Sequence, residues 1–263
     1  MKALSQRRRH PLAAVALLLL GLLVTGGLYA AVSGANEAQA ASTAYTADDK
    51  DQGEKLFIAN CATCHGMDAS GSANGPSLIG VGAASVDFQV GTGRMPMAMQ
   101  GPQAQQKPVQ FTEEQTSQLA AYVASLGAGP VVPDAETVDA AGGNAAEGGE
   151  LFRVNCAMCH NAAGAGGALT QGKFAPSLEG VSEKHIYEAM VTGPQNMPVF
   201  NDANVSPEDK QSIIAFLKNI EANGSPGGAQ LGSLGPVSEG LFIWTAGLGL
   251  VIAFTIWLTS RSS

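Results

Sequence analysis

The stretch Cys61-Ala62-Thr63-Cys64-His65 is the most informative part of the chain, and it recurs as Cys156-Ala157-Met158-Cys159-His160. The C-x-x-C-H spacing is the attachment signature of c-type haem, because two thiols three positions apart can each add to one vinyl group while the next imidazole reaches the iron. A redox dithiol or a zinc knuckle is the alternative, but neither needs a histidine directly after the second cysteine. The sequence therefore predicts two covalently bound haem c groups. Their attachment residues are Cys61, Cys64, Cys156 and Cys159.

A tandem duplication surrounds the two motifs. The second motif lies 95 positions after the first, and Gly53 and Phe57 agree with Gly148 and Phe152 at the same offset. Pro-Ser-Leu follows each motif, at 76–78 and at 176–178, so the second copy has five extra residues in its Gly/Ala-rich loop. Later, both copies share the pattern G-x-x-x-M-P, at 91–96 and 193–198. The chain is therefore predicted to hold two related domains.

Each copy is predicted to end in an amphipathic helix. Thr112 and Ser206 are N-cap hydroxyls followed by first-turn acids, and Pro207 adds a favourable first helical residue. Apolar residues then recur with helical spacing, at positions 119, 122, 123 and 126 and at 213, 216, 217 and 220. Ahead of each motif, a glycine and a phenylalanine four apart predict a helix that another helix crosses closely.

These residues resemble class I cytochromes c, in which such an N-terminal helix crosses a C-terminal helix bearing Leu-x-x-Tyr, here Leu119 and Tyr122. The resemblance implies an all-α fold of two tandem class I cytochrome c domains, with N-terminal and C-terminal transmembrane helices added. The expected boundaries are a cytoplasmic basic tail at 1–10, a transmembrane helix or signal peptide at 11–32, domain 1 at 46–127, a linker at 128–147, domain 2 at 148–222, a linker at 223–239 and a transmembrane helix at 240–259.

The iron ligands are predicted from the motifs. His65 and His160 are the proximal ligands by their place in C-x-x-C-H. The resemblance implies that the carbonyls of Pro76 and Pro176 accept from the other ring nitrogens of these histidines. A methionine thioether is expected on the other side of each iron, because a soft neutral sulfur favours ferrous iron. Met95 and Met197 are chosen because both precede proline and match the family's ligand. The competing methionines are Met97, Met99 and Met190.

Three further side chains are weaker candidates. His185, on a helix expected from 182 to 190, offers a bis-histidine haem, but an exposed helix position is favoured because Glu183 and Lys184 precede it. Arg94 and Arg153 are each candidates for binding a haem propionate, although an exposed arginine needs no such role. No catalytic residues are expected, because an iron with two protein ligands has no room for substrate.

Two apolar segments predict membrane spans. Residues 11–32 carry no charge and are longer than the usual core of a signal peptide, although Ala38-Gln39-Ala40 resembles a cleavage site. The second segment, at 240–259, holds Trp244 and Trp257 near its ends, where interfacial rings are expected. Three arginines at 7–9 and Arg261 favour the cytoplasm, which places the haem domains on the extracytoplasmic side of the cell membrane.

The net charge excludes one class of partner. The chain has 14 basic and 22 acidic residues, a formal charge of −8, so nucleic acid is not an expected partner. A solvated surface is favoured as the reason for this acidity over steering of a cationic redox partner.

The order of all these parts resembles the dihaem cytochrome c subunit of the actinobacterial cytochrome bcc complex, a menaquinol:cytochrome c reductase. The resemblance implies a cytochrome b subunit and a Rieske iron-sulfur subunit as partners, and electrons passing towards a haem-copper cytochrome oxidase. Three alternatives stay open: a membrane-anchored dihaem carrier for another oxidase or dehydrogenase, a dihaem peroxidase, and a haem-based gas sensor. A fold and a motif alone do not decide among them.

Overall fold

A computed structural model of the chain describes residues 15–29, 45–224, 231–233 and 236–261. The basic tail predicted at 1–10 and the cleavage site Ala38-Gln39-Ala40 lie outside these residues. The chain divides into two compact units, of which the first runs to Asp87 and resumes at Phe111–Val131. The second contains Phe88–Gln110 together with the chain from Val132 onward. The division thus falls inside helix α5 (Ala83–Gly91).

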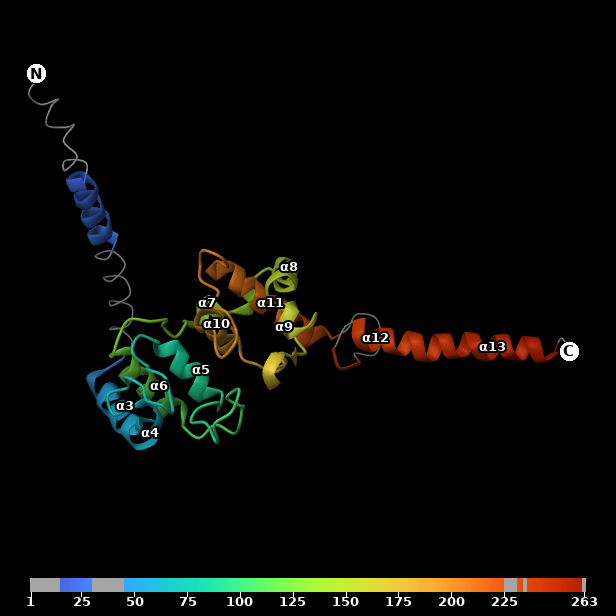
Figure 1. Ribbon diagram of the computed structural model, residues 1–263, viewed down its shortest axis with the longest axis horizontal. Coiled ribbons are helices and arrows are strands. Elements are labelled where there is room, and N and C mark those ends of the chain that lie inside the picture. The colour runs from blue at the N-terminus through green and yellow to red at the C-terminus, as the bar shows by residue number, and fades with distance from the viewer. Residues whose placement is uncertain (1–14, 30–44, 225–230, 234–235, 262–263) are drawn as a thin grey trace, which may run out of the picture. The chain divides into compact units, whose positions relative to one another are not determined.

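The first unit is built on helices α3 (Ala47–Asn60), α4 (Ala62–His65) and α6 (Glu113–Ala124), shown in Figure 1. Helix α3 begins at a capping box: the Asp49 amide donates to Thr46 Oγ1 at 3.1 Å, and the Thr46 amide donates to Asp49 Oδ2 at 2.9 Å. Thr112 and Gln115 form the same reciprocal pair at the start of α6. Side chains thereby satisfy amides that the first turn of a helix leaves without partners.

The predicted close helix crossing is confirmed in both units. A Cβ added to Gly53 on α3 would collide with the main-chain carbonyl of Gln118 on α6. Buried Phe57 lies beside this crossing, with its ring centroid 5.1 Å from that of Tyr122. In the second unit, Gly148 likewise lies against the main-chain carbonyl of Ser212. Glycine is required at both crossings because a side chain there would meet backbone, which cannot move aside cheaply.

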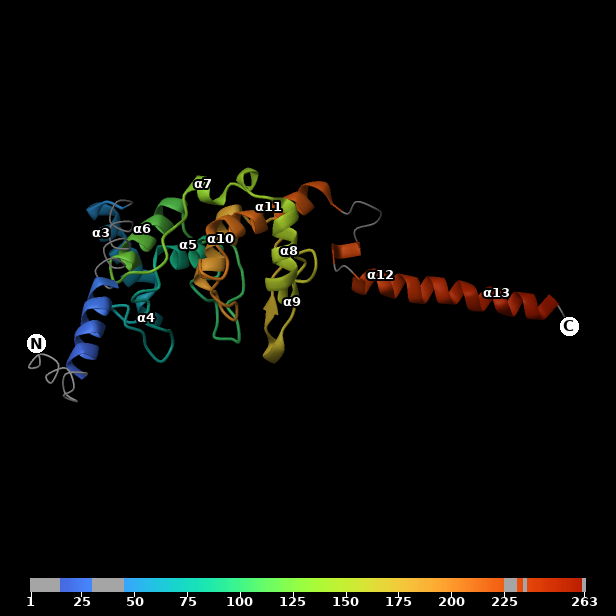
Figure 2. The same cartoon turned by 90° about the horizontal axis from the view of Figure 1, so that it is seen from above.

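The second unit contains the other set of helices. They are α7 (Ala135–Val138), the 3₁₀ turn η1 (Ala140–Gly142), α8 (Ala145–Asn155), α9 (Ala157–His160), α10 (Glu183–Thr192) and α11 (Pro207–Asn223). Helix α8 crosses α11, as the view in Figure 2 shows. The rings of Phe152 and Phe216 meet there, with centroids 5.4 Å apart. This crossing closes one side of a core that also includes Ile214 and Leu217.

The linker predicted at 128–147 is more structured than its composition indicated. It contains α7 and η1, and Asp134 caps α7 by accepting from the Thr137 amide at 2.7 Å. Val138 packs into the core of the second unit. Helix α8 also begins within the predicted linker, after the N-cap Asn144. Single buried residues such as Val138 give no periodic signal, which is why the sequence pattern missed them.

A short hairpin modifies the all-α expectation. Strands β1 (Gly167–Ala168) and β2 (Phe174–Ala175) pair antiparallel, with Gly167 opposite Ala175, around the 3₁₀ turn η2 (Thr170–Gly172). The hairpin follows the Gly/Ala-rich loop that is longer in the second copy. The fold is therefore helical with this one small sheet among the described residues.

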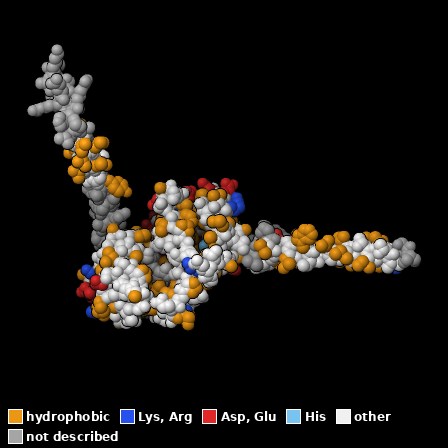
Figure 3. Space-filling model, viewed as in Figure 1, with side chains coloured by type: hydrophobic (Ala, Val, Ile, Leu, Met, Phe, Trp, Pro, Cys, Tyr) orange, Lys and Arg blue, Asp and Glu red, His pale blue; other side chains and the backbone are white. Residues whose placement is uncertain are grey.

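One long apolar helix stands at the C-terminal end of the described residues. The 3₁₀ turn η3 (Leu231–Ser233) precedes α12 (Pro236–Phe242), a π-helical segment (Ile243–Gly247) and α13 (Leu248–Arg261). Residues Val237–Arg261 form 25 helical residues whose hydrophobic side chains are exposed, seen in orange in Figure 3. Such a helix reaches about 37 Å, enough to cross a bilayer. The N-terminal helix, Val15–Tyr29, is shorter.

Candidate haem-binding sites

The first motif lies on a single helical turn. Helix α4 holds Ala62–His65, and the His65 amide donates to the Cys61 carbonyl at 3.0 Å. His65 Nδ1 lies 2.8 Å from the carbonyl oxygen of Pro76. Because a carbonyl can only accept, Nδ1 carries the proton, and Nε2 keeps the lone pair that a metal needs. The carbonyl acceptor implied for His65 is thereby confirmed.

The second motif repeats this geometry on α9. His160 Nδ1 donates to the carbonyl of Pro176 at 3.0 Å, which confirms the second predicted acceptor. The His160 side chain is buried, and this burial lowers the pKa of the imidazole below its ordinary value. The neutral ring, which alone can bind a metal, is therefore favoured at neutral pH.

The four cysteines form no disulfide, and burial changes the pKa of the first cysteine of each motif. Burial raises the pKa of Cys61 to about 11, with a smaller contribution from the charge of Cys64. Burial, followed by the charge of Cys159, also raises the pKa of Cys156 to about 11. A redox-active dithiol needs a thiol whose pKa is lowered towards neutrality. The pKa values of Cys61 and Cys156 are shifted in the opposite direction, which argues against the dithiol alternative.

A cavity of about 880 Å³ opens beside the second motif. Cys156, Cys159, His160 and Pro176 line it together with apolar side chains such as Ile213 and Leu217. It lies within the size range of cofactor pockets, which are mostly apolar with a few placed polar groups. The residues present therefore fit a large flat apolar group, attached through two thiols and bound at its metal by His160 Nε2.

Both candidate methionines of the second copy line this cavity. Met190 is a buried core residue on α10. Met197 is half-buried in the loop that follows α10, where its amide donates to the Pro194 carbonyl at 3.0 Å. The structure thus brings both thioethers to the site, and Met197 stays a prediction as the iron ligand.

Met95 lies in the segment Phe88–Gln110, which belongs to the second unit, whereas His65 belongs to the first. The Met95 amide donates to the Gln89 carbonyl at 2.9 Å, and the Met95–Pro96 peptide bond is cis. Met97 is half-buried, while Met99 is 78% exposed and therefore a poor ligand candidate. The pairing of Met95 with His65 on one iron stays a prediction.

The segment Phe88–Gln110 also contributes to the wall of the cavity. Gln103 Nε2 donates to the Phe174 carbonyl at 2.9 Å, and the Phe174 amide donates back to Gln103 Oε1 at 2.9 Å. The Ala104 amide donates to Gln195 Oε1 at 3.3 Å. Gln103 was not predicted, because no local pattern marks a lone glutamine as a bridge between distant segments.

The two candidate arginines differ in their surroundings. Arg94 lines the cavity and stacks over the Phe88 ring, with its guanidinium carbon 4.8 Å from the ring centroid. Burial lowers the pKa of Arg94, so an anionic neighbour would be favourable there. Arg153 is exposed and does not line the cavity. Only Arg94 keeps support as a propionate-binding residue.

The expectation that His185 is exposed was wrong. The helix predicted around it is confirmed as α10, but the His185 side chain is only 19% exposed. Its Nε2 lies 3.9 Å from the buried carboxylate of Glu188, and its ring meets Phe88 edge-on at 6.1 Å. Phe88 comes from a segment far away in the sequence, so its cover over His185 was not visible in the pattern around residue 185.

Comparison with protein-family models identifies two domains. Residues 51–127 match the model described as "Cytochrome c". Residues 143–217 match the model described as "Cytochrome C oxidase, cbb3-type, subunit III". Both matches include a C-x-x-C-H motif, so each repeat is a cytochrome c domain.

Curated relatives match nearly the whole chain. A protein of Corynebacterium efficiens named "Cytochrome bc1 complex cytochrome c subunit" is 45% identical over 99% of this chain and 94% of its own length. The chain belongs to this family of cytochrome c subunits. A Mycobacterium tuberculosis protein with the same name is 42% identical over 98% of the chain and 94% of its own length. By contrast, a Synechocystis "Cytochrome c-553-like" protein is 32% identical over 30% of the chain and 70% of its own length.

This cytochrome c subunit therefore carries two covalently bound haem c groups. Each of its two domains supplies a C-x-x-C-H motif, and in each the motif histidine is oriented by a proline carbonyl. Cys61 with Cys64, and Cys156 with Cys159, supply the thioether links. The long C-terminal apolar helix is consistent with a membrane location for a respiratory complex subunit.

Proposed function

We propose that the chain is the electron-transfer subunit of a respiratory quinol:cytochrome c reductase. The observation that carries this proposal is the near full-length similarity to subunits named for the cytochrome bc1 complex. Haem c, when bound, supplies an iron that accepts and returns one electron. The function is then that of a relay, and no independent substrate site is expected.

Residues of the chain would determine how each iron is coordinated. His65 and His160 present Nε2 while the carbonyls of Pro76 and Pro176 hold their Nδ1 protons. We infer that Met95 and Met197 would each supply the second protein ligand of one haem iron, because they share one position before proline in the two copies. A thioether ligand favours the reduced iron and leaves no open coordination position.

Carbon monoxide tests the ligand assignment, since it binds ferrous haem only where a coordination position is open. Met95→Ala and Met197→Ala should each make one haem reactive to carbon monoxide and lower its potential. Met97→Ala and Met190→Ala are the controls and should leave both haems closed. An unchanged spectrum for Met95→Ala would reassign the ligand of the first domain.

The remaining parts of the proposal concern partners and topology. Electrons would enter from a Rieske iron-sulfur subunit beside a cytochrome b subunit and leave towards a haem-copper oxidase. The haem domains, at 46–127 and 148–222, would lie outside the cell membrane between two spans. The exposed C-terminal helix supports one span, and Arg261 at its end favours the cytoplasm. For the other span, at 11–32, the described part is the helix Val15–Tyr29.

Purification of the native membrane assembly tests the proposal. A tag after Ser263 should recover the cytochrome b and Rieske subunits, and menaquinol should reduce both haems of the assembly. Inhibiting quinol oxidation should abolish this reduction, while dithionite still reduces both haems. Recovery of an oxidase or a dehydrogenase without any cytochrome b would contradict the proposal.

The family match of the second domain supports a second candidate. Its resemblance to subunit III of a cbb3-type oxidase favours a dihaem carrier that serves an oxidase directly. Such a carrier would be reduced without cytochrome b. A dihaem peroxidase instead needs an open iron, so peroxide turnover by the purified protein would favour that enzyme.

A further inference from the structure

The start of helix α11 holds a buried cation. The Lys210 side chain is fully buried, at 0% exposure. Lysine is almost never fully buried unless it is paired, because removing an ammonium group from water is costly. The contacts of this ammonium group therefore indicate what it holds in place.

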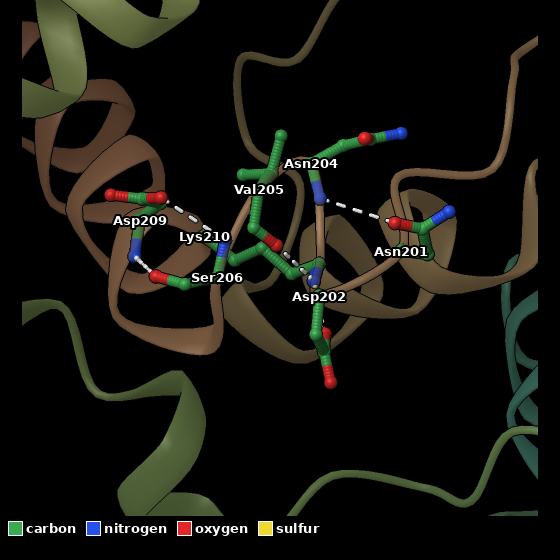
Figure 4. Close-up of polar contacts among 7 residues, drawn as sticks. All are labelled: Asn201, Asp202, Asn204, Val205, Ser206, Asp209 and Lys210. Carbon is green, nitrogen blue, oxygen red and sulfur yellow. Dashed lines mark hydrogen bonds and ion pairs between the residues drawn. The ribbon is translucent and has the colours of Figure 1, made fainter.

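Lys210 Nζ donates to two acceptors in the loop just before α11. It donates to Asp202 Oδ1 at 2.6 Å and to the Val205 carbonyl at 2.7 Å, as seen in Figure 4. It also lies 5.8 Å from the centroid of the Tyr187 ring on α10. A rigid helix thus reaches back and fixes both a side chain and the main chain of the preceding loop.

The loop segment that Lys210 contacts, residues 201–205, is short and is held by its own hydrogen bonds. Asn201 accepts the Asn204 amide at its side chain, at 3.1 Å, and the Val205 amide at its carbonyl, at 3.0 Å. The Val205 side chain is buried in the core of the second unit. Ser206 and Asp209 form the capping box that begins α11 directly after it. Lys210 therefore fastens the exit of the loop to the helix.

The entry of the same loop is fastened to α10. Gly193 ends α10 with a positive φ of 60°, and the Phe200 amide donates to the Met190 carbonyl at 2.8 Å. Met197 lies between these two contacts, five positions before Asp202. Helix α10 therefore holds the Met197 segment on both sides, and Lys210 fastens the part of the loop that follows Phe200.

We propose that Lys210, through its contacts with Asp202 and Val205, is a positioning residue that keeps Met197 on the iron of the second haem. This proposal rests on Met197 being the axial ligand in the proposed function. A neutral thioether is a weak ligand, so its bond to the metal depends on how firmly the loop is held. Releasing the exit of the loop would free the Met197 sulfur to move away, and the second haem would then be open to small ligands.

The first domain supplies an internal control. Helix α6 begins at the N-cap Thr112, as α11 begins at Ser206, and the position that matches Lys210 is Thr116. Threonine has a shorter side chain with no ammonium group, so it cannot make the contacts that Lys210 makes with the loop. A variant at Lys210 should therefore change the second haem and leave the first unchanged.

The test uses the full-length dihaem protein in its membrane form. Asp202→Asn keeps the shape of an exposed side chain and removes the charge that pairs with Lys210, and Lys210→Met removes the ammonium group while keeping its volume. Loss of this charge-assisted hydrogen bond should raise, by about tenfold, the fraction of the protein in which the second haem reacts with carbon monoxide. The potential of that haem should fall, and Asp202→Glu should restore the wild-type behaviour.

The matched control is Glu208→Gln, which removes an exposed negative charge two residues before Lys210 and should change neither haem. If the role of Lys210 were purely structural, its substitution would lower the melting temperature without making the second haem reactive to carbon monoxide. If Met197→Ala opens the second haem while Asp202→Asn and Lys210→Met leave it closed with an unchanged potential, the positioning role is overturned and the proposed function stands. If Met197→Ala itself leaves the haem closed, the ligand assignment fails, and the proposal for Lys210 fails with it.

Discussion

The loop that carries the proposed methionine ligand differs between the two repeats. In the second repeat it spans only 193–206, and buried Lys210 closes its exit with an ion pair. In the first repeat it spans 92–112, and its residues up to Gln110 belong to the second unit. There Lys107 Nζ donates to the Gly93 carbonyl at 2.9 Å, but Lys107 is only half-buried. In both loops a lysine donates to a main-chain carbonyl, and only in the second does that lysine, buried Lys210, also pair with a carboxylate, that of exposed Asp202.

The helical frame, in contrast, is nearly the same in the two domains. Each has a glycine at the helix crossing, a buried phenylalanine beside it and a histidine bound to a proline carbonyl. The comparison shows that the parts which attach and orient the haem are shared, while the loop that carries the proposed methionine ligand differs between the domains. Substitutions in the frame should therefore act alike in both domains, and substitutions in the loops should not.

The largest effect is expected from the attachment cysteines. Replacing Cys156 and Cys159 with serine should remove the covalent haem from the second domain only, because serine forms no thioether link. Intact-protein mass spectrometry should show the mass of one haem instead of two. The matched change of Cys61 and Cys64 should remove the other haem. Loss of both haems from either variant would show that the two domains do not acquire haem independently.

Gly148→Ala tests the shared frame. The new methyl group would meet the Ser212 carbonyl, so overpacking should destabilise the second domain by about 1–3 kcal/mol. The control Gly149→Ala meets only side chains, the ring of Phe216 with its nearest carbon at 3.0 Å and Arg153 Nη1 at 3.6 Å, and both can shift. Thermal unfolding followed by haem absorbance should separate the two variants. Equal melting temperatures would contradict the close crossing.

Gln103→Ala tests the divergent loop. It removes both hydrogen bonds to Phe174, each contributing about 0.5–1.5 kcal/mol. Hydrogen exchange at the Phe174 amide should accelerate, and strand β2 should loosen at the edge of the cavity. Gln105→Ala, at an exposed neighbouring position, is the control and should leave this exchange unchanged. If the Phe174 amide exchanges as slowly in Gln103→Ala as in the wild type, the segment Phe88–Gln110 does not hold this wall of the cavity.

The smallest effect concerns the helix ahead of each C-x-x-C-H motif, α3 or α8, and depends on pH. Hydrogen bonds from Thr46 lower the pKa of Asp49 from its ordinary value of 3.8, whereas Asn144 caps α8 without an ionisable group. A lowered folded-state pKa stabilises above pH 3.8, and this stabilisation is lost as the pH falls through the folded-state value. Amides at the start of α3 should therefore lose protection in acid before those of α8. Thr46→Ala should abolish this difference, and equal acid sensitivity in the wild type would exclude it.

Most of the frame could be predicted from the sequence because its signals are local. The C-x-x-C-H motif, the N-caps Thr112 and Ser206, and the glycine four residues before a phenylalanine all lie within a few positions. The contacts of Gln103 and Lys210 could not be predicted in this way. Each depends on which distant main-chain atoms the fold brings within 3 Å of a flexible side chain. His185 was misjudged for the same reason, since Phe88 covers it from another part of the chain.

Both motif histidines are held by main-chain oxygens, those of residues 76 and 176. Every amino acid carries that oxygen, so no single codon change at either position can delete it. A substitution at either position can weaken the hydrogen bond to the imidazole only by changing the backbone conformation of the loop. The basicity of both imidazoles is thus protected from substitution at these two positions, which leaves the proposed methionine ligands as the place where selection can tune one potential against the other.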